Sequence, residues 1–105
     1  MSVHEIQAEE LKQRLDAGEN LYLLDVREED EFATTNIGGH LIPLSQLPER
    51  VKELDSNQEI VTICKRGPRG VKAADFLEHA GFKVSNLSGG LYAWSDRIDS
   101  SVRKY

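Results

Sequence analysis

The sequence predicts an α/β fold with a mainly parallel central sheet and helices on both faces. Short apolar runs typical of buried strands alternate along the chain with longer amphipathic segments typical of helices. Strands joined through helices pair in parallel and place the helices on both faces of the sheet. The 105 residues contain no linker, repeat or low-complexity stretch. A chain of this length buries one core without disulfides, so we expect a single domain over residues 1–105.

Four segments have the composition of strands. The first is a nearly continuous apolar run, Leu21 to Val26, which is typical of a strand covered on both faces. The third, Glu59 to Ile63, is rich in β-branched residues, which favour extended structure. In chain order, the predicted strands are residues 21–26, 41–42, 59–63 and 82–87.

Five segments are predicted to be helices. In chain order, they are residues 8–17, 27–34, 44–54, 71–80 and 91–98. The first ends at Gly18 and the fourth at Gly81, and glycine is the residue that most often follows a helix. The third keeps apolar residues at helical spacing and has Pro48 in its first turn, where proline is tolerated. The acidic run 28–31 in the second is interpreted as a solvated helix start.

The only cysteine, Cys64, directly follows the predicted strand 59–63. Its position is the carboxyl edge of the sheet, where open α/β sheets bind ligands. Backbone N–H groups and the dipole of the following helix favour anions there, including a thiolate. The next six residues contain three cations and two glycines, Lys65-Arg66-Gly67-Pro68-Arg69-Gly70. A buried structural cysteine needs no such surroundings, so we interpret Cys64 as a nucleophile.

Composition argues against several other kinds of site. The formal net charge of −5 argues against a general nucleic-acid binder. A single cysteine forms no intramolecular disulfide or multi-cysteine zinc site, and His4, His40 and His79 lack ligand spacing. We therefore expect no metal and no cofactor, with His40 a surface residue. The chain has neither a signal peptide nor a membrane-spanning run, so we expect a cytoplasmic protein with no membrane partner.

Five motifs, in order along the chain, resemble the rhodanese-like sulfurtransferase domain. They are Leu24-Asp25-Val26-Arg27 followed by Glu31-Phe32, then Ile42-Pro43-Leu44, then residues 64–70, then Ala80-Gly81-Phe82, then residues 87–94. The resemblance covers residues 3–105. It is nearest to the C-terminal rhodanese-like domains of adenylyltransferase–sulfurtransferase proteins, and we expect the domain to stand alone here.

The resemblance implies a sulfurtransferase in which Cys64 takes sulfur from a sulfane donor, thiosulfate or a protein persulfide, and becomes a persulfide. The outer sulfur then passes to a thiol, to cyanide or to a sulfur-carrier protein. Residues 65–70 are implied to form the substrate-binding loop. The implied partners are small sulfur donors, a cysteine desulfurase or a sulfur-carrier protein, and the protein is expected to be a monomer. The sequence identifies neither the physiological donor nor the acceptor.

The site motif departs from the family pattern at two positions. Gly70 stands where most members carry a hydroxyl residue, and Pro68 removes one backbone N–H from the loop. Asp25, Arg27 and Glu31 are predicted to give structural support, with Arg27 paired to Glu31 at i+4.

Two other functions remain as alternatives. Cysteine phosphatases and arsenate reductases also surround an anion with Cys and Arg, but in phosphatases five residues separate the two. Here four residues separate Cys64 from Arg69, and Ile63 stands where many phosphatases have His. The second alternative is a non-catalytic interaction module, although such copies of the domain usually lack the cysteine.

Overall fold

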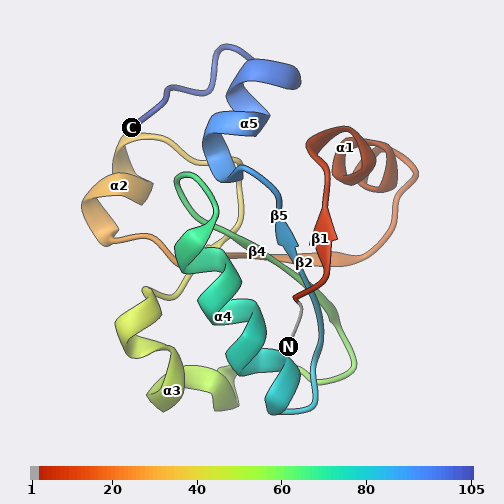
Figure 1. Ribbon diagram of the computed structural model, residues 1–105, viewed down its shortest axis with the longest axis vertical. Helices are drawn as coiled ribbons and strands as arrows, with labels where there is room; N and C mark the ends of the chain where they lie inside the picture. Colours follow the sequence, from red (N-terminus) through yellow and green to blue (C-terminus); the bar gives the residue numbers. More distant parts are fainter. Residues whose placement is uncertain (1–2) are drawn as a thin grey trace.

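The strands of the computed structural model, which describes residues 3–105, pair in the order β1-β5-β4-β2-β3 (Figure 1). Every described pairing is parallel, which confirms the predicted sheet. The sequence did not predict β1, because two residues are too few to show an alternating pattern. Residues 1–2 of the predicted domain lie outside the described residues. The strands are β1 (Glu5–Ile6), β2 (Leu21–Asp25), β3 (His40–Leu41), β4 (Glu59–Ile63) and β5 (Lys83–Leu87).

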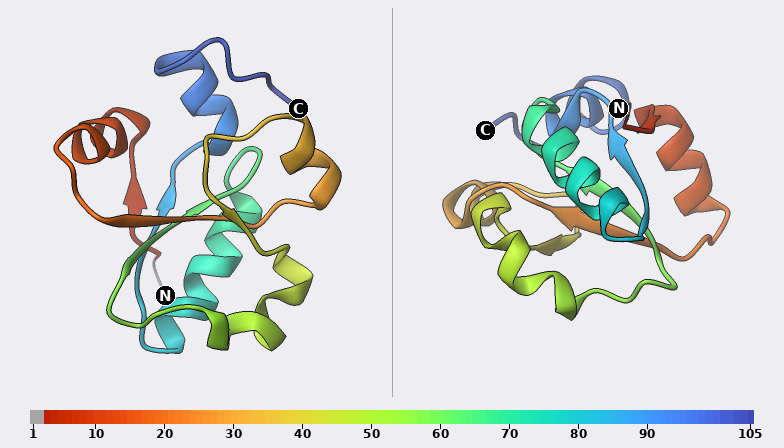
Figure 2. Two further views of the ribbon diagram at one scale, coloured as in Figure 1. Left: turned by 180° about the vertical axis from the view of Figure 1, so that it is seen from behind. Right: turned by 60° about the horizontal axis from the view of Figure 1, so that its bottom comes forward.

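Helices cover both faces of this sheet, as predicted (Figure 2). They are α1 (Ala8–Asp16), α2 (Glu29–Thr34), α3 (Leu47–Arg50), α4 (Pro68–His79) and α5 (Gly90–Arg97), with 3-10 turns η1 (Leu44–Gln46) and η2 (Val51–Glu53) on either side of α3. The longest, α4, has 12 residues. In the part of the chain that the structure describes, no helix combines the length and apolar character needed to cross a membrane.

The hydrophobic core forms one layer on each side of the sheet. Ile60 and Val61 are neighbours on β4 and belong to different layers, because successive side chains of a strand point to opposite faces. The layer under α3 and α4 includes Leu24, Ile42, Leu47, Ile60, Leu77 and Cys64. The layer under α1 and α5 includes Ile6, Leu11, Val61, Leu87 and Trp94. The thiol thus lies at one end of the α3–α4 layer.

The bounds of every predicted helix shift in the structure, by more than two residues or into separate segments in two of them. The segment 44–54 is not one helix but η1, α3 and η2 in succession, with Pro48 in the first turn of α3. Its apolar spacing was helical, but the hydrogen bonds change from 3-10 to α and back. The helix predicted over 71–80 begins earlier, at Pro68, because proline has the backbone angle of a first helical position and its missing N–H has no acceptor to lose there. Arg69 and Gly70 are therefore helical residues.

Candidate active site

Cys64 is the first residue after β4, at the carboxyl edge of the sheet, as the sequence indicated. It is only 1% exposed. Its sulfur has a polar partner nonetheless, since the Gly67 N–H donates to Cys64 Sγ over 3.0 Å. The turn that makes this contact requires Gly67, whose φ of 128° is a conformation that side chains disfavour. The thiol is therefore buried but lies against a backbone amide.

The first turn of α5 binds the loop that follows Cys64 (Figure 1). The Leu91 N–H donates to the Cys64 carbonyl over 2.8 Å, and the Tyr92 N–H donates to the Lys65 carbonyl over 3.1 Å. In a planar trans peptide, the N–H points opposite to the C=O of the same unit. The carbonyls of Cys64 and Lys65 point at α5, so the N–H groups of Lys65 and Arg66 point away from α5. The helix thereby sets the direction of two loop amides.

Gly90 makes this approach of α5 to the loop sterically possible. A Cβ on Gly90 would lie 2.5 Å from the Cys64 carbonyl oxygen and 2.7 Å from the carbonyl carbon of Lys65. Its φ of 63° is also in the left-handed region. The sequence analysis identified this glycine only as part of a resemblance motif, because its role depends on a contact between segments far apart in the chain.

A buried polar pair occupies the space beside Gly70. Thr62 on β4 and Asn86 on β5 are directly paired in the sheet, and both are almost fully buried. The Thr62 hydroxyl donates to the Gly70 carbonyl over 2.9 Å, and Asn86 Oδ1 lies 3.1 Å from Thr62 Oγ1. A Cβ at position 70 would overlap Asn86 Oδ1, so a hydroxyl residue there would require the Asn86 side chain to move. Neither polar residue was predicted to lie at the site; the one available signal was a polar residue inside each predicted strand.

The Arg69 side chain is paired and does not project freely into solvent. Its two terminal nitrogens donate to the two carboxylate oxygens of Glu31 on α2, over 2.6 and 2.9 Å. The Glu28 N–H also donates to Glu31, over 2.8 Å. Glu31 is therefore a partly buried ion-pair partner, which corrects its interpretation as part of a solvated acidic run.

The predicted pair between the side chains of Arg27 and Glu31 is wrong. The carboxylate partner of Arg27 is Asp25, whose oxygens accept from Arg27 Nε and Nη2 at 2.8 to 3.2 Å. Arg27 also donates to the backbone carbonyls of Glu31 and Thr35. The i+4 rule fails because Arg27 lies before α2, outside the helix on which that spacing would align two side chains. The fully buried pair instead ties the end of β2 to α2 and to Thr35, the residue that follows it.

The remaining loop cations lie nearer to α5. The Arg66 guanidinium carbon lies 4.9 Å from the centre of the Tyr92 ring, and Lys104 Nζ lies 5.9 Å from the same ring. Arg66 is exposed and Lys65 is half-buried. Positive charge therefore surrounds Tyr92 beside the loop, on a chain whose net charge is negative.

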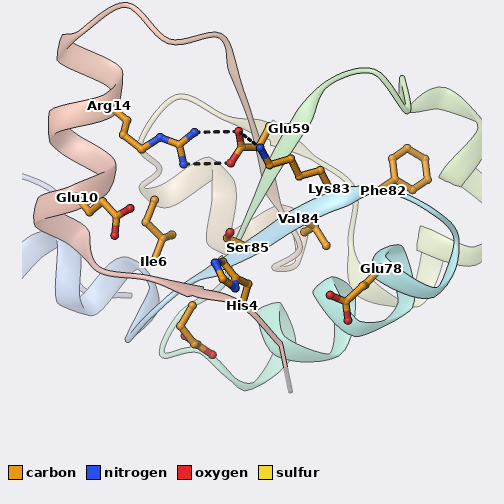
Figure 3. Close-up of a pocket in the computed structure, with 11 residues that line it drawn as sticks. His4, Ile6, Glu10, Arg14, Glu59, Glu78, Phe82, Lys83, Val84 and Ser85 are labelled. Carbon is orange, nitrogen blue, oxygen red and sulfur yellow. Dashed lines mark hydrogen bonds and ion pairs between the residues drawn. The ribbon is translucent and has the colours of Figure 1, made fainter. Parts of the chain in front are cut away.

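Two features outside this region do not join it. The exposed His40 ring stacks on Tyr22, with 4.4 Å between the ring centres. A cleft of about 480 Å³ lies at the opposite, amino-terminal edge of β4 and β5 (Figure 3). There Arg14 and Lys83 both contact Glu59, at 2.8 and 3.5 Å, so its cations are already paired (Figure 3). The cleft does not include Cys64.

The close approach at Gly90 predicts a large effect of Gly90→Ala on stability. We expect a loss of roughly 2 to 4 kcal/mol in the free energy of unfolding, measured in urea, since the new methyl group collides with backbone atoms. Gly81→Ala is the matched control, because Gly81 also has a positive φ but has no atom within 4 Å of a built Cβ. It should lose only about 1 kcal/mol. Equal losses in the two variants would show that α5 does not constrain the loop.

The ion pair between Arg69 and Glu31 predicts a pH-dependent contribution to stability. Hydrogen bonds from Arg69 hold the pKa of the Glu31 carboxyl at about 2, against an ordinary 4.5, although burial opposes the shift. Because the folded state disfavours the protonated acid, this stabilisation is present above pH 4.5 and is lost as the pH falls toward 2. The difference in unfolding free energy between wild type and Glu31→Gln should shrink over that interval. A difference that stays constant over this interval would argue against the pair.

Similarity to known proteins identifies the family of this chain. The sequence matches the rhodanese-like domain family over residues 7–97. The YtwF protein of Bacillus subtilis is 39% identical over 95 residues, which cover 90% of this chain and 92% of that protein. The "Sulfurtransferase" of Allochromatium vinosum is 36% identical over 95 residues, 89% of each chain.

The expected likeness to adenylyltransferase–sulfurtransferase proteins is confirmed. The "Adenylyltransferase and sulfurtransferase MOCS3-2" of Zea mays is 34% identical over 109 residues, 95% of this chain but 23% of that protein. Among solved structures, the rhodanese-related protein of Thermoplasma volcanium superposes with a TM-score of 0.84 at 29% identity, over 90% of this chain and 93% of the other. From its sequence and its fold alike, the chain belongs to the family of rhodanese-like domains.

Proposed function

We propose that residues 1–105 act as one sulfurtransferase domain that carries sulfur as a persulfide on Cys64. The names of the Allochromatium and maize relatives support transfer of sulfur as the class of reaction. The contact that carries the assignment to Cys64 is the 3.0 Å hydrogen bond from the Gly67 N–H to Sγ. A thiolate is the reactive form of cysteine, and a backbone donor at its sulfur stabilises that negative charge.

The proposed reaction has two displacement steps at sulfur. The Cys64 thiolate attacks the outer sulfur of thiosulfate, the sulfur–sulfur bond of the donor breaks, and sulfite leaves with the electron pair. In the second step, an acceptor nucleophile attacks the outer sulfur of the persulfide, and the Cys64 thiolate leaves. A protein persulfide serves equally as donor, with its own thiolate as the leaving group.

The loop amides are suited to the persulfide intermediate. The outer sulfur carries negative charge and needs hydrogen-bond donors near the mouth of the loop. The N–H groups of Lys65 and Arg66 are directed away from α5 by the bonds from Leu91 and Tyr92, so they are available to it. In the first turn of α4, the N–H groups of Arg69 and Gly70 have no acceptor within the helix, whereas Pro68 has no N–H and the Val71 N–H donates to the Gly67 carbonyl over 2.9 Å. Residues 65–70 thus act mainly through their backbone.

The position of Arg69 disfavours the phosphatase and arsenate reductase alternatives. A phosphate ligand held by the two terminal nitrogens of Arg69 would have to compete with Glu31, whose two carboxylate oxygens already accept from both. The interaction module is the stronger rival, because a thiol that is 1% exposed also suits a purely structural cysteine. Chemistry at the sulfur separates the two.

The acceptor and the cellular setting belong to the same proposal. The maize relative is named for adenylyl transfer as well as sulfur transfer, which supports a sulfur-carrier protein as acceptor. Thiols and cyanide are the small acceptors, and a cysteine desulfurase is the protein donor. We place the protein in the cytoplasm as a monomer without metal or cofactor.

Intact-mass measurement after incubation with thiosulfate, and separately with a cysteine desulfurase and cysteine, tests the function. We expect an adduct of roughly +32 Da on the wild type that cyanide or a thiol removes, because one sulfur atom is added to Cys64. Cys64→Ser is the matched control and should carry no adduct. Absence of the adduct with every donor, from a folded wild type, would support the interaction module. Robust hydrolysis of aryl phosphates, lost in Cys64→Ser, would instead support the phosphatase.

A further inference from the structure

We propose that Glu31 determines which sulfur donors the site accepts, by neutralising Arg69 so that donors with little negative charge are preferred over dianionic thiosulfate. The preferred class is small or protein-borne alkyl persulfides. The inference rests on the proposed sulfurtransferase function and adds a role for a residue outside the loop.

The contacts of Glu31 fix Arg69 in a neutral pair. Both carboxylate oxygens accept from Arg69, at 2.6 and 2.9 Å, and one of them also accepts from the Glu28 N–H at 2.8 Å. The Glu31 side chain is 13% exposed and that of Arg69 is 32% exposed, so water screens the pair only in part. To present these two terminal nitrogens to an anionic donor, the guanidinium would have to leave both oxygens. The only cation in the first turn of α4 is therefore not free to bind a donor.

Both members of the pair are charged at neutral pH. Hydrogen bonds from Arg69 hold the pKa of Glu31 at about 2. The same bonds raise the pKa of Arg69, and the negative charge of Cys64 adds to the rise. Arg69 lies in the first turn of α4, two residues after Gly67, whose N–H donates to Cys64 Sγ, so Arg69 and the carboxylate that neutralises it lie at the end of α4 that is next to the sulfur.

The cations that remain are less well placed to select an anion. Arg66 is exposed and lies over the Tyr92 ring, and Lys65 is half-buried. Exposed charges are screened by water and salt, whereas the partly buried pair is screened less. The net charge close to Cys64 thus depends largely on whether the Glu31 carboxylate neutralises Arg69.

Two persulfide donors of opposite charge react with Cys64 in the same way, so a comparison of their rates separates the effect of charge at the site from the transfer reaction itself. In each case the Cys64 thiolate attacks the outer sulfur, the donor's sulfur–sulfur bond breaks, and the donor thiolate leaves with the electron pair. The proton of the outer sulfur stays with it, so Cys64 becomes a persulfide. Cysteamine persulfide carries an ammonium group and mercaptopropionate persulfide a carboxylate, each two carbons from sulfur. Thiosulfate provides a third, more anionic donor.

The experiment measures the second-order rate constant for loading sulfur on Cys64 with each donor, by rapid alkylation and intact mass. The readout is the rate constant for mercaptopropionate persulfide, the anionic donor, divided by the rate constant for cysteamine persulfide, the cationic donor. Glu31→Gln should raise this ratio about three- to tenfold, because it removes one negative charge near the reacting sulfur while the amide keeps the shape of the side chain. Use of thiosulfate should rise with it. The exposed Glu29→Gln is the control with the same change in net charge, and its ratio should stay within about twofold of wild type.

A double variant separates charge from packing. Arg69→Ala alone leaves the Glu31 carboxylate uncompensated and should lower the ratio. Glu31→Gln with Arg69→Ala restores a neutral site and should return the ratio to near the wild-type value, even if both variants lose stability. An unchanged or lowered ratio in Glu31→Gln, with Cys64 still loaded by both donors, would overturn the selectivity and leave the sulfurtransferase intact. Failure of every donor to load folded wild type would overturn both.

Discussion

The hydrogen bonds between the first turn of α5 and the carbonyls of Cys64 and Lys65 are the constraint on which the site depends. They join the last helix of the chain to the loop after β4, and they turn the loop amides away from α5. The contact is possible only because Gly90 has no side chain. The loop proposed to bind sulfur is thus shaped mainly by backbone contacts between two segments far apart in the sequence.

Arg27 and Arg69, near the carboxyl edge of the sheet, mainly connect structural elements through ion pairs and hydrogen bonds. Arg27 is fully buried against Asp25 and binds the carbonyl of Thr35, so it ties β2 to α2. Arg69 then ties α2 to the first turn of α4 through Glu31. The two pairs hold α2 beside the loop while adding no net charge to it. Stabilisation of a bound anion is therefore left mainly to backbone N–H groups, whose direction α5 controls.

The sequence was sufficient for features that depend on local pattern. The buried strands, the position of Cys64 after β4 and the helices on both faces follow from apolar runs and their alternation. The partners of charged side chains were not predictable in this way. Arg27 has Asp25 and Glu31 at plausible spacings, and only the fold decides that Glu31 pairs with Arg69, 38 residues away.

The same limit applies to the polar residues beside Gly70. Against the family pattern, Gly70 indicated that a hydroxyl group is absent from the site. In the structure, the side chains of Thr62 and Asn86, which are paired on neighbouring strands, occupy the space beside Gly70. Such a replacement depends on strand register, which a single sequence does not specify when both strands are buried on two faces.

The most direct test of the account is the amide NMR spectrum of the protein with and without a sulfur atom on Cys64. If the loop amides hold the outer sulfur, the N–H resonances of Lys65 and Arg66 should move strongly on persulfide formation. The N–H of Ser85, in the cleft at the opposite edge of the sheet, should stay in place. Shifts at Lys65 and Arg66 no larger than that of Ser85, in protein shown by mass to carry the sulfur, would contradict the account.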